Sequence, residues 1–273
     1  MGASDVYGGS VFTITASIVV LLYVASAGFY LAVMISDRKA LATPGLATLS
    51  LGMLAHTASL VLKLSESGSQ ALLAIQMSFS ILALLLGVGF LAMRKLYGLN
   101  SIASFVVPLM MILQVVAVMA EPDAVVVHEW RGPLLTLHIA MSLLGTAAFV
   151  LAALTSVFYL IQDHNLRRKK FGPLFNKLPS VDVLDLANVR LVTVGFPVYT
   201  LAIALGSFWA WGSTSALQVQ YLFAIASWLI YAGIIHARIT IGWRGRRAAA
   251  LTLVGLAGLG AVLSIYLARS THL

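Results

Sequence analysis

The chain has 273 residues, of which 60% are hydrophobic and only 10% are charged, and its formal net charge is +8. Soluble domains carry roughly 25% charged residues, so a water-soluble globular fold of this length is excluded. The Lys and Arg residues lie between apolar runs, which is typical of a membrane protein and argues against nucleic-acid binding. There is no cysteine, which excludes disulfides, CxxC redox chemistry, covalent haem attachment and thiolate metal sites.

Eight apolar runs follow one another along the chain, each about long enough to cross ~30 Å of hydrocarbon. They predict helices near 11–35, 44–65, 71–93, 101–120, 133–162, 189–211, 217–238 and 248–268. The N-terminus has no basic segment before the first run, so this run is expected to be a retained helix and not a cleaved signal peptide. The predicted fold is all-α, a polytopic integral membrane bundle of about eight transmembrane helices forming a single domain over residues 1–273.

The basic residues predict the orientation of this bundle. Of the 17 Lys and Arg residues, all but Lys63, Arg131 and Arg269 lie in or next to the loops after the first, third, fifth and seventh runs. The positive-inside rule then places both termini outside and the basic loop 163–188 in the cytoplasm. Ser180 is expected to cap a short interfacial helix in this loop. The expected location is a bacterial inner membrane.

Few side chains inside the runs carry chemistry. No Asp or Glu lies well inside any run, which disfavours proton-coupled carriers and pumps. No Ser-His-Asp pattern, HExxH motif or glycine-rich phosphate loop occurs, so no catalytic residue is predicted. The ionisable side chains that remain at membrane depth are His56, His138 and His236.

His56 and His138 lie in different runs at similar depth. At ~1.5 Å rise per residue, both are roughly 8–12 Å below the outer surface. Two imidazoles at one depth are what a bis-histidine b-type haem requires, each with its other ring nitrogen held by a neighbouring acceptor. His138 shares a helix face with Ser142, Gly145 and Phe149, and the small residues would leave room for a porphyrin edge.

Two interpretations of these histidines stay open. Histidine in a membrane helix is also common as an interhelical hydrogen-bond donor without a cofactor, and small residues on one face are also explained by helix packing. His236 lies ~28 Å below the outer surface and cannot share a haem with His138, so it belongs to a separate inner site or has a packing role. Among the others, His164 is a weak partner for His236, His128 is expected on the outer surface, and His272 is terminal.

Several motifs occur together along the chain. They are His56-Thr57 followed by Lys63, Pro133 to His138, Phe158-Tyr159-Leu160, Leu178 to Val181 before Asp185, Gly195-Phe196-Pro197 followed by Gly206 and Trp209, Trp228 to Tyr231 with His236, and Gly242 to Ala248. On these motifs the chain resembles the CcsA/HemX-type cytochrome c assembly family over essentially its whole length. Within that family it is most similar to the eight-helix, YpjD-like members that lack the full tryptophan-rich motif.

The resemblance implies an inner-membrane haem-binding or haem-handling protein associated with cytochrome c assembly. By position, His138 corresponds to the family histidine that opens the fifth helix, His236 to the one after the tryptophan-rich tract, and His56 to one in the N-terminal half. It implies non-covalent haem b with His56 and His138 as iron ligands and His236 as a further cofactor-binding residue. The implied partners are haem, the lipid bilayer and other cytochrome c assembly proteins, with no nucleic acid.

One departure from the family narrows the expected activity. Haem-lyase members carry an outer tract with Trp-Asp-Pro, whereas residues 208–216 here have no Asp. This difference predicts haem binding, delivery or regulation without enzymatic ligation. Two alternatives remain: a haem-free membrane scaffold or regulator of the same fold, and a small-solute transporter, which the missing intramembrane carboxylates disfavour.

Overall fold

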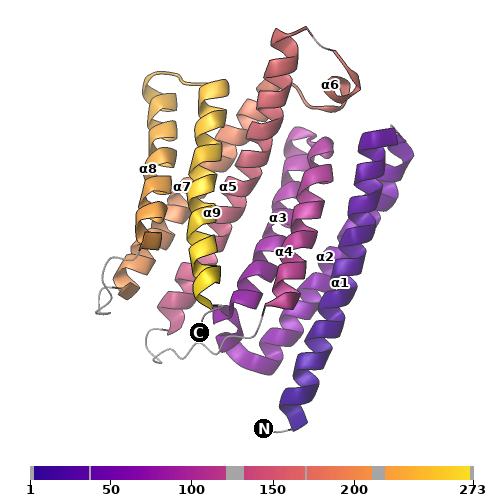
Figure 1. Cartoon of the computed structure of the whole chain (residues 1–273), viewed down its shortest axis with the longest axis vertical. Helices are drawn as coiled ribbons and strands as arrows, with labels where there is room; N and C mark the ends of the chain where they lie inside the picture. Colours follow the sequence, from indigo (N-terminus) through magenta and orange to yellow (C-terminus); the bar gives the residue numbers. More distant parts are fainter. Residues whose placement is uncertain (1–2, 37, 121–131, 170, 211–218, 271–273) are drawn as a thin grey trace. The chain divides into compact units, whose positions relative to one another are not determined.

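The computed structural model describes residues 3–36, 38–120, 132–169, 171–210 and 219–270 (Figure 1). The long helices in this part of the chain are α1 (Ala3–Ser36), α2 (Ala42–Ser67), α3 (Ile75–Tyr97), α4 (Ala103–Met119), α5 (Gly132–Arg167), α7 (Val181–Ala210), α8 (Val219–Thr240) and α9 (Arg246–Ser270). Shorter helices are η1 (Lys39–Leu41), η2 (Gly68–Leu73), η3 (Asn100–Ile102) and α6 (Pro173–Lys177). His128, His272 and the tract from Trp211 to Ala216 lie outside the described residues.

Eight helical spans of the described chain are long and apolar enough to cross a membrane. The predicted all-α bundle of about eight transmembrane helices is therefore confirmed, and the chain is a multi-pass membrane protein. α7 begins at Val181, well before the predicted start at 189, so the short helix expected after Ser180 and the sixth span form one continuous helix. Ser180 Oγ accepts a hydrogen bond from Val183 N at 3.4 Å, which caps this helix.

The chain divides into two compact units, each described by itself. The first comprises Met1–Ala92 and Asn100–Val127, and in it α1 packs against α2 and α4. Close approach of α1 and α2 depends on Gly52, because a Cβ there would lie 2.9 Å from the Tyr23 ring. The single-domain organisation expected for residues 1–273 stays a prediction.

The second unit comprises Met93–Leu99 and His128–Leu273. In it α5 packs against α7 and α9, and α8 packs against α7 and α9 (Figure 1). Its core holds a stack of Phe149 on Tyr231, with ring centroids 3.7 Å apart and planes within 3°. Tyr199 contacts Phe149 edge to face at 5.6 Å. α5, α7 and α8 each contribute one ring to this core.

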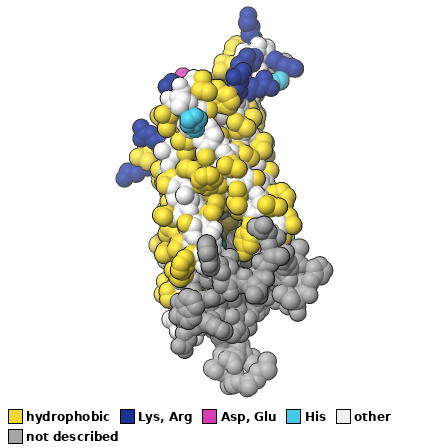
Figure 2. All heavy atoms as spheres, turned by 90° about the vertical axis from the view of Figure 1, so that its left-hand side faces the viewer, with side chains coloured by type: hydrophobic (Ala, Val, Ile, Leu, Met, Phe, Trp, Pro, Cys, Tyr) yellow, Lys and Arg dark blue, Asp and Glu magenta, His cyan; other side chains and the backbone are white. Residues whose placement is uncertain are grey.

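The surface of the second unit suits a lipid environment. Large apolar side chains are exposed along its helices, among them Leu201, Leu222, Leu229 and Val254. Figure 2 shows apolar side chains covering the middle of one face, with Lys and Arg gathered towards its upper end. Exposed apolar faces bounded by basic side chains are expected where helices meet acyl chains and then headgroups.

We predict that Gly255→Ala lowers the stability of the second unit. A Cβ at this position in α9 would lie 2.8 Å from Cζ of the fully buried Tyr231, so α8 and α9 would have to separate or the Phe149–Tyr231 stack shift. Such overpacking costs about 1–3 kcal/mol. Thermal unfolding in detergent measures the loss.

Gly260→Ala in the same helix is the matched control, because no atom lies within 4 Å of a Cβ built there. Its stability should stay equal or rise by up to about 1 kcal/mol, since alanine favours helix over glycine. Equal unfolding temperatures for the two variants would contradict the packing described for Tyr231.

Candidate functional site

His138 lies in the second turn of α5 and is half-buried. Its Nδ1 is 2.7 Å from the carbonyl oxygen of Ala202 on α7. A carbonyl oxygen can only accept, so Nδ1 carries the proton and donates it. In the neutral ring, Nε2 then holds the lone pair. This is the arrangement in which a protein presents Nε2 to a metal, with the other nitrogen held by a backbone carbonyl.

Gly206 makes room for the His138 ring on α7. A Cβ at this position would lie 2.7 Å from Cε1 and 2.9 Å from Nδ1 of the imidazole. Ala202 and Gly206 are four residues apart and therefore lie on the same face of α7. The carbonyl fixes the ring by its Nδ1–H, and the missing side chain of Gly206 admits its edge.

The small-residue face of α5 is filled by protein below His138. A Cβ on Gly145 would lie 3.0 Å from Cβ of Tyr199, and Phe149 is buried in the core of the unit. Gly145 therefore serves close packing of α5 on α7, the second of the two interpretations left open for this face.

His56 lies in the first unit at the centre of a buried polar chain. Its Nδ1 is 2.9 Å from the hydroxyl of Tyr23 on α1, and its Nε2 is 2.7 Å from Oγ of Ser80 on α3. Ser80 Oγ in turn donates to Oε1 of Gln114 on α4 at 2.9 Å. All three partners and His56 lie away from the surface, so four helices are linked through one polar chain.

The direction of this chain follows from its last bond. Ser80 has one hydroxyl proton, which it gives to Gln114, so it must accept a proton from Nε2 of His56. Nδ1 of the neutral ring then accepts from the Tyr23 hydroxyl. His56 therefore carries its proton on Nε2, the opposite tautomer from His138, and both of its nitrogens are engaged within the protein.

Gln114 ends the chain with an unmatched group. It is fully buried, and within the described residues its Nε2 has no hydrogen-bond partner. A polar side chain inside an apolar run is the signal by which the sequence could have identified it. Sequence analysis did not single out Tyr23, Ser80 or Gln114.

The remaining predicted histidine, His236, is exposed on α8. Its backbone carbonyl accepts a hydrogen bond from Thr240 Oγ1, within the last turn of that helix. α5 and α8 run in the same direction in Figure 1, so the early turn of α5 and the last turns of α8 lie at opposite ends of the unit. The structure thus separates His236 from His138. His164, near the end of α5, is also exposed.

The sequence analysis names Asp185 only within a family motif and does not predict its ion pair with Arg238, which joins three elements of the second unit. Asp185 on α7 accepts hydrogen bonds from both terminal nitrogens of Arg238 on α8, at 3.1 and 2.6 Å. It also accepts from Gly245 N, in the turn before α9, at 3.0 Å. Gly245 has φ +72°, and a Cβ built on it would lie 2.5 Å from the Tyr159 hydroxyl oxygen, so a glycine is required there.

Comparison with known proteins identifies the family. A family model described as cytochrome C assembly protein matches residues 47–270. The chain belongs to the cytochrome c assembly family. The predicted resemblance is confirmed, and the matched region includes His56, His138 and His236.

Curated relatives of this family member are cytochrome c biogenesis proteins named CcsA. The one from Synechococcus sp. (strain CC9311) is 30% identical over 254 residues, which cover 80% of this chain and 83% of the relative. The one from Mesostigma viride is 27% identical over 191 residues, which cover 62% and 60%. The one from Synechococcus elongatus is 42% identical over 82 residues, 29% of this chain and 25% of the relative. No solved structure matches the chain.

We predict that Asp185→Ala destabilises the second unit by about 2–3 kcal/mol. The change leaves the mostly buried Arg238 without its counter-charge and Gly245 N without its acceptor. The double variant Asp185→Arg with Arg238→Asp should recover part of the loss, because the ion pair re-forms without the bond from Gly245. Thermal unfolding of the purified variants measures both effects.

Asp182→Ala, one turn earlier on α7, is the control. Its carboxylate is exposed and accepts no hydrogen bond from a described residue, so the expected change is below about 1 kcal/mol. Equal losses for the two aspartates would show that the Asp185 ion pair does not hold the helices together.

Proposed function

We propose that this member of the cytochrome c assembly family binds haem b non-covalently in a bacterial inner membrane and handles it for cytochrome c assembly, with His138 as an iron ligand. The observation that carries the proposal is the bond from Nδ1–H of His138 to the Ala202 carbonyl, which leaves the lone pair on Nε2. When bound, haem supplies an iron centre able to change oxidation state. CcsA proteins, the relatives of this chain, are named for cytochrome c biogenesis.

The surroundings of His138 fit an axial ligand. Its ring is held at one edge by a backbone carbonyl and accommodated by Gly206, so the orientation of Nε2 is fixed before any ligand arrives. A ligand whose ring is already fixed in the binding tautomer loses little entropy on binding, and the carbonyl raises its basicity. Half-burial leaves part of the imidazole accessible.

His56 is the proposed second ligand, and it requires a change of tautomer. In the structure Nε2 donates to Ser80. If the proton moves to Nδ1, that nitrogen donates to the Tyr23 oxygen and Nε2 becomes free to bind iron once Ser80 turns away. Nε2 of His56 is thus blocked by a hydrogen bond until the tautomer changes, whereas Nε2 of His138 is already available to bind iron. His236, exposed and at the other end of its unit, is proposed for a separate inner site.

The proposed orientation keeps both termini outside and the basic segments in the cytoplasm. Arg167, Arg168 and Lys169 follow one another at the end of α5 and are all exposed, as expected of side chains that meet anionic headgroups. His138, near the other end of α5, then lies towards the outer face. The proposed partners are haem, the bilayer and other cytochrome c assembly proteins.

We predict that the protein purified in detergent from haem-replete cells shows a Soret band and a b-type pyridine haemochrome. His138→Ala should abolish most of this absorbance, because among the described histidines it is the one whose Nδ1–H is held by a backbone carbonyl while Nε2 keeps its lone pair. His164→Ala, at an exposed histidine near the other end of α5, is the control and should retain the absorbance.

Colourless wild-type protein would support the alternative of a haem-free scaffold. Equal absorbance in the His138 and His164 variants would show that haem, where bound, does not use His138. Thermal unfolding of each variant distinguishes a variant that has lost haem binding from one that no longer folds.

We predict that Ser80→Ala strengthens haem binding if His56 is the second ligand. Removing Oγ removes the acceptor that competes for the proton on Nε2, so the ligating tautomer costs less. The expected gain is about tenfold in haem affinity, the equivalent of one hydrogen bond of about 1.4 kcal/mol. Titration of haem into the haem-free protein measures it.

Ser78→Ala is the matched control on the same helix, since the one bond of its hydroxyl to a described residue is to the carbonyl of Ala74, in the preceding turn. It should leave the affinity unchanged. Unchanged affinity in Ser80→Ala as well would assign His56 to the alternative role of a hydrogen-bonding residue between helices.

A further inference from the structure

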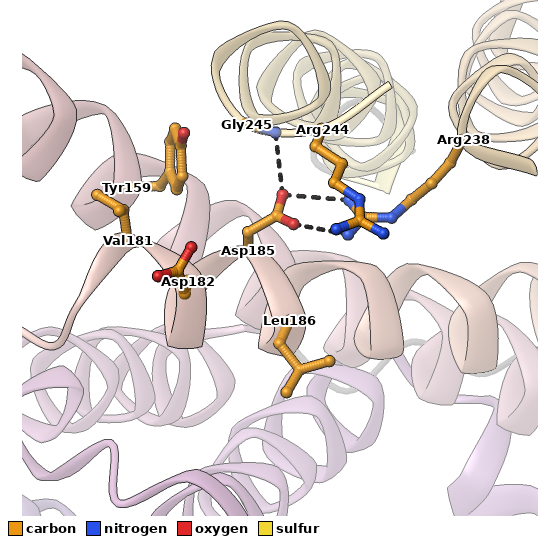
Figure 3. Close-up of a pocket in the computed structure, with 8 residues that line it drawn as sticks. All are labelled: Tyr159, Val181, Asp182, Asp185, Leu186, Arg238, Arg244 and Gly245. Carbon is orange, nitrogen blue, oxygen red and sulfur yellow. Dashed lines mark hydrogen bonds and ion pairs between the residues drawn. The ribbon is translucent and has the colours of Figure 1, made fainter. Parts of the chain in front are cut away.

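An open cavity of about 380 Å³ lies at one end of the second unit, among the ends of α5, α7 and α8 and the turn before α9 (Figure 3). This size falls in the range of roughly 300–1,000 Å³ that small-ligand sites occupy. The cavity is lined by Tyr159, Val181, Asp182, Asp185, Leu186, Arg238, Arg244 and Gly245.

Part of the charge in this lining is already matched. Asp185 accepts from Arg238 twice and from Gly245 N once, and both terminal nitrogens of Arg238 are engaged in that pair. The pair is mostly buried, with side-chain exposures of 17% for Asp185 and 15% for Arg238. The opposite charges of Asp185 and Arg238 neutralise each other, so this part of the lining attracts a charged ligand only weakly.

Two charged side chains of opposite sign remain for a ligand. Arg244 and Asp182 are both exposed, and neither makes a hydrogen bond or ion pair with a described residue. Figure 3 shows Arg244 reaching over the Asp185–Arg238 pair from one side, with Asp182 and Tyr159 on the other side of Asp185. A positive and a negative group therefore face the same cavity from separate positions.

This arrangement selects the charge pattern of the ligand. A simple anion attracted to Arg244 would meet the carboxylate of Asp182, and a simple cation attracted to Asp182 would meet Arg244. A molecule that carries both an anionic and a cationic group satisfies the two side chains together. Arg guanidinium groups match phosphate, and a carboxylate matches an ammonium with N–H donors.

The position of the cavity favours a lipid as the source of such a molecule. Asp185 is about 6 Å along α7 from its first residue, and Arg238 lies in the last turn of α8, so both are at the level where spanning helices meet headgroups. Leu186 in the lining is 42% exposed, and Ile239 beside Arg238 is 79% exposed. These side chains offer apolar surface for acyl chains directly beside the charged groups.

We propose that this cavity binds the headgroup of a zwitterionic phospholipid, with Arg244 on the phosphate and Asp182 on a primary ammonium. The Tyr159 hydroxyl, which also lines the cavity, supplies a further polar contact. The site is independent of haem binding and shares no residue with the surroundings of His138.

Native mass spectrometry of the full chain, released from nanodiscs of defined composition, tests the site. Dioleoyl phosphatidylethanolamine should be retained about tenfold more than phosphatidylcholine, whose methylated ammonium has no N–H to give Asp182, and more than phosphatidylglycerol, which has no ammonium. Asp182→Asn and Arg244→Gln should each reduce this retention about five- to tenfold. Arg246→Gln, a nearby exposed arginine that does not line the cavity, is the control and should leave it unchanged.

A site for a zwitterion also predicts that one substitution changes the retention of two lipids in opposite directions. Asp182→Asn should increase retention of phosphatidylglycerol while it decreases that of phosphatidylethanolamine, because the repelling carboxylate is removed. Equal retention of the three lipids, or equal effects in the Arg246 control, would overturn the proposal. Displacement of bound lipid by soluble O-phosphoethanolamine at equal concentration would overturn the assignment to a lipid. Circular dichroism and thermal unfolding establish that each variant is folded.

Discussion

The hydrogen bond from His138 to the carbonyl of Ala202 is the interaction on which the proposed site depends. It joins the beginning of α5 to α7 at 2.7 Å and sets the proton on Nδ1. The contact is possible because α7 carries glycine at position 206 and because α5 and α7 approach closely at Gly145 and Tyr199. The hydrogen bond of His138 therefore depends on the packing of α5 against α7. A change that separates these two helices would also break this bond and free the imidazole ring.

His138 and His56 differ in how many of their ring nitrogens are hydrogen-bonded within the protein. A membrane interior makes an unsatisfied polar group costly, so each ring must bond to something. His138 satisfies one nitrogen with a carbonyl and leaves the other available. His56 satisfies both, through Tyr23 and Ser80, within a chain that reaches Gln114. In the structure, the hydrogen bond between His56 Nε2 and Ser80 is therefore what distinguishes the two rings.

The helical architecture was predictable because hydrophobic length is a strong signal. Each run had to satisfy its backbone inside lipid, and helices are the structures that do so within one segment. The site was only partly predictable. His138 and His56 stand out as ionisable groups in apolar runs, but the Ala202 carbonyl carries no signal in the sequence, and the Tyr23 and Ser80 contacts depend on helix rotation. Asp185 falls in the predicted loop 163–188, where a charged residue is expected to be solvated. In the structure it instead accepts hydrogen bonds from Arg238 and Gly245.

¹⁵N NMR of histidine-labelled, haem-free protein measures the protonation of the His138 ring directly, with signals assigned by the loss of one resonance set in each histidine variant. His138 should carry its proton on Nδ1 and have an unprotonated Nε2. When haem is added, its Nε2 signal should change before the signals of the other histidines. His56 is predicted to carry its proton on Nε2 in the same sample. A proton on Nε2 of His138, or a haem-dependent change that leaves its signals unaltered, would show that the hydrogen bond to Ala202 does not prepare this ring to bind haem.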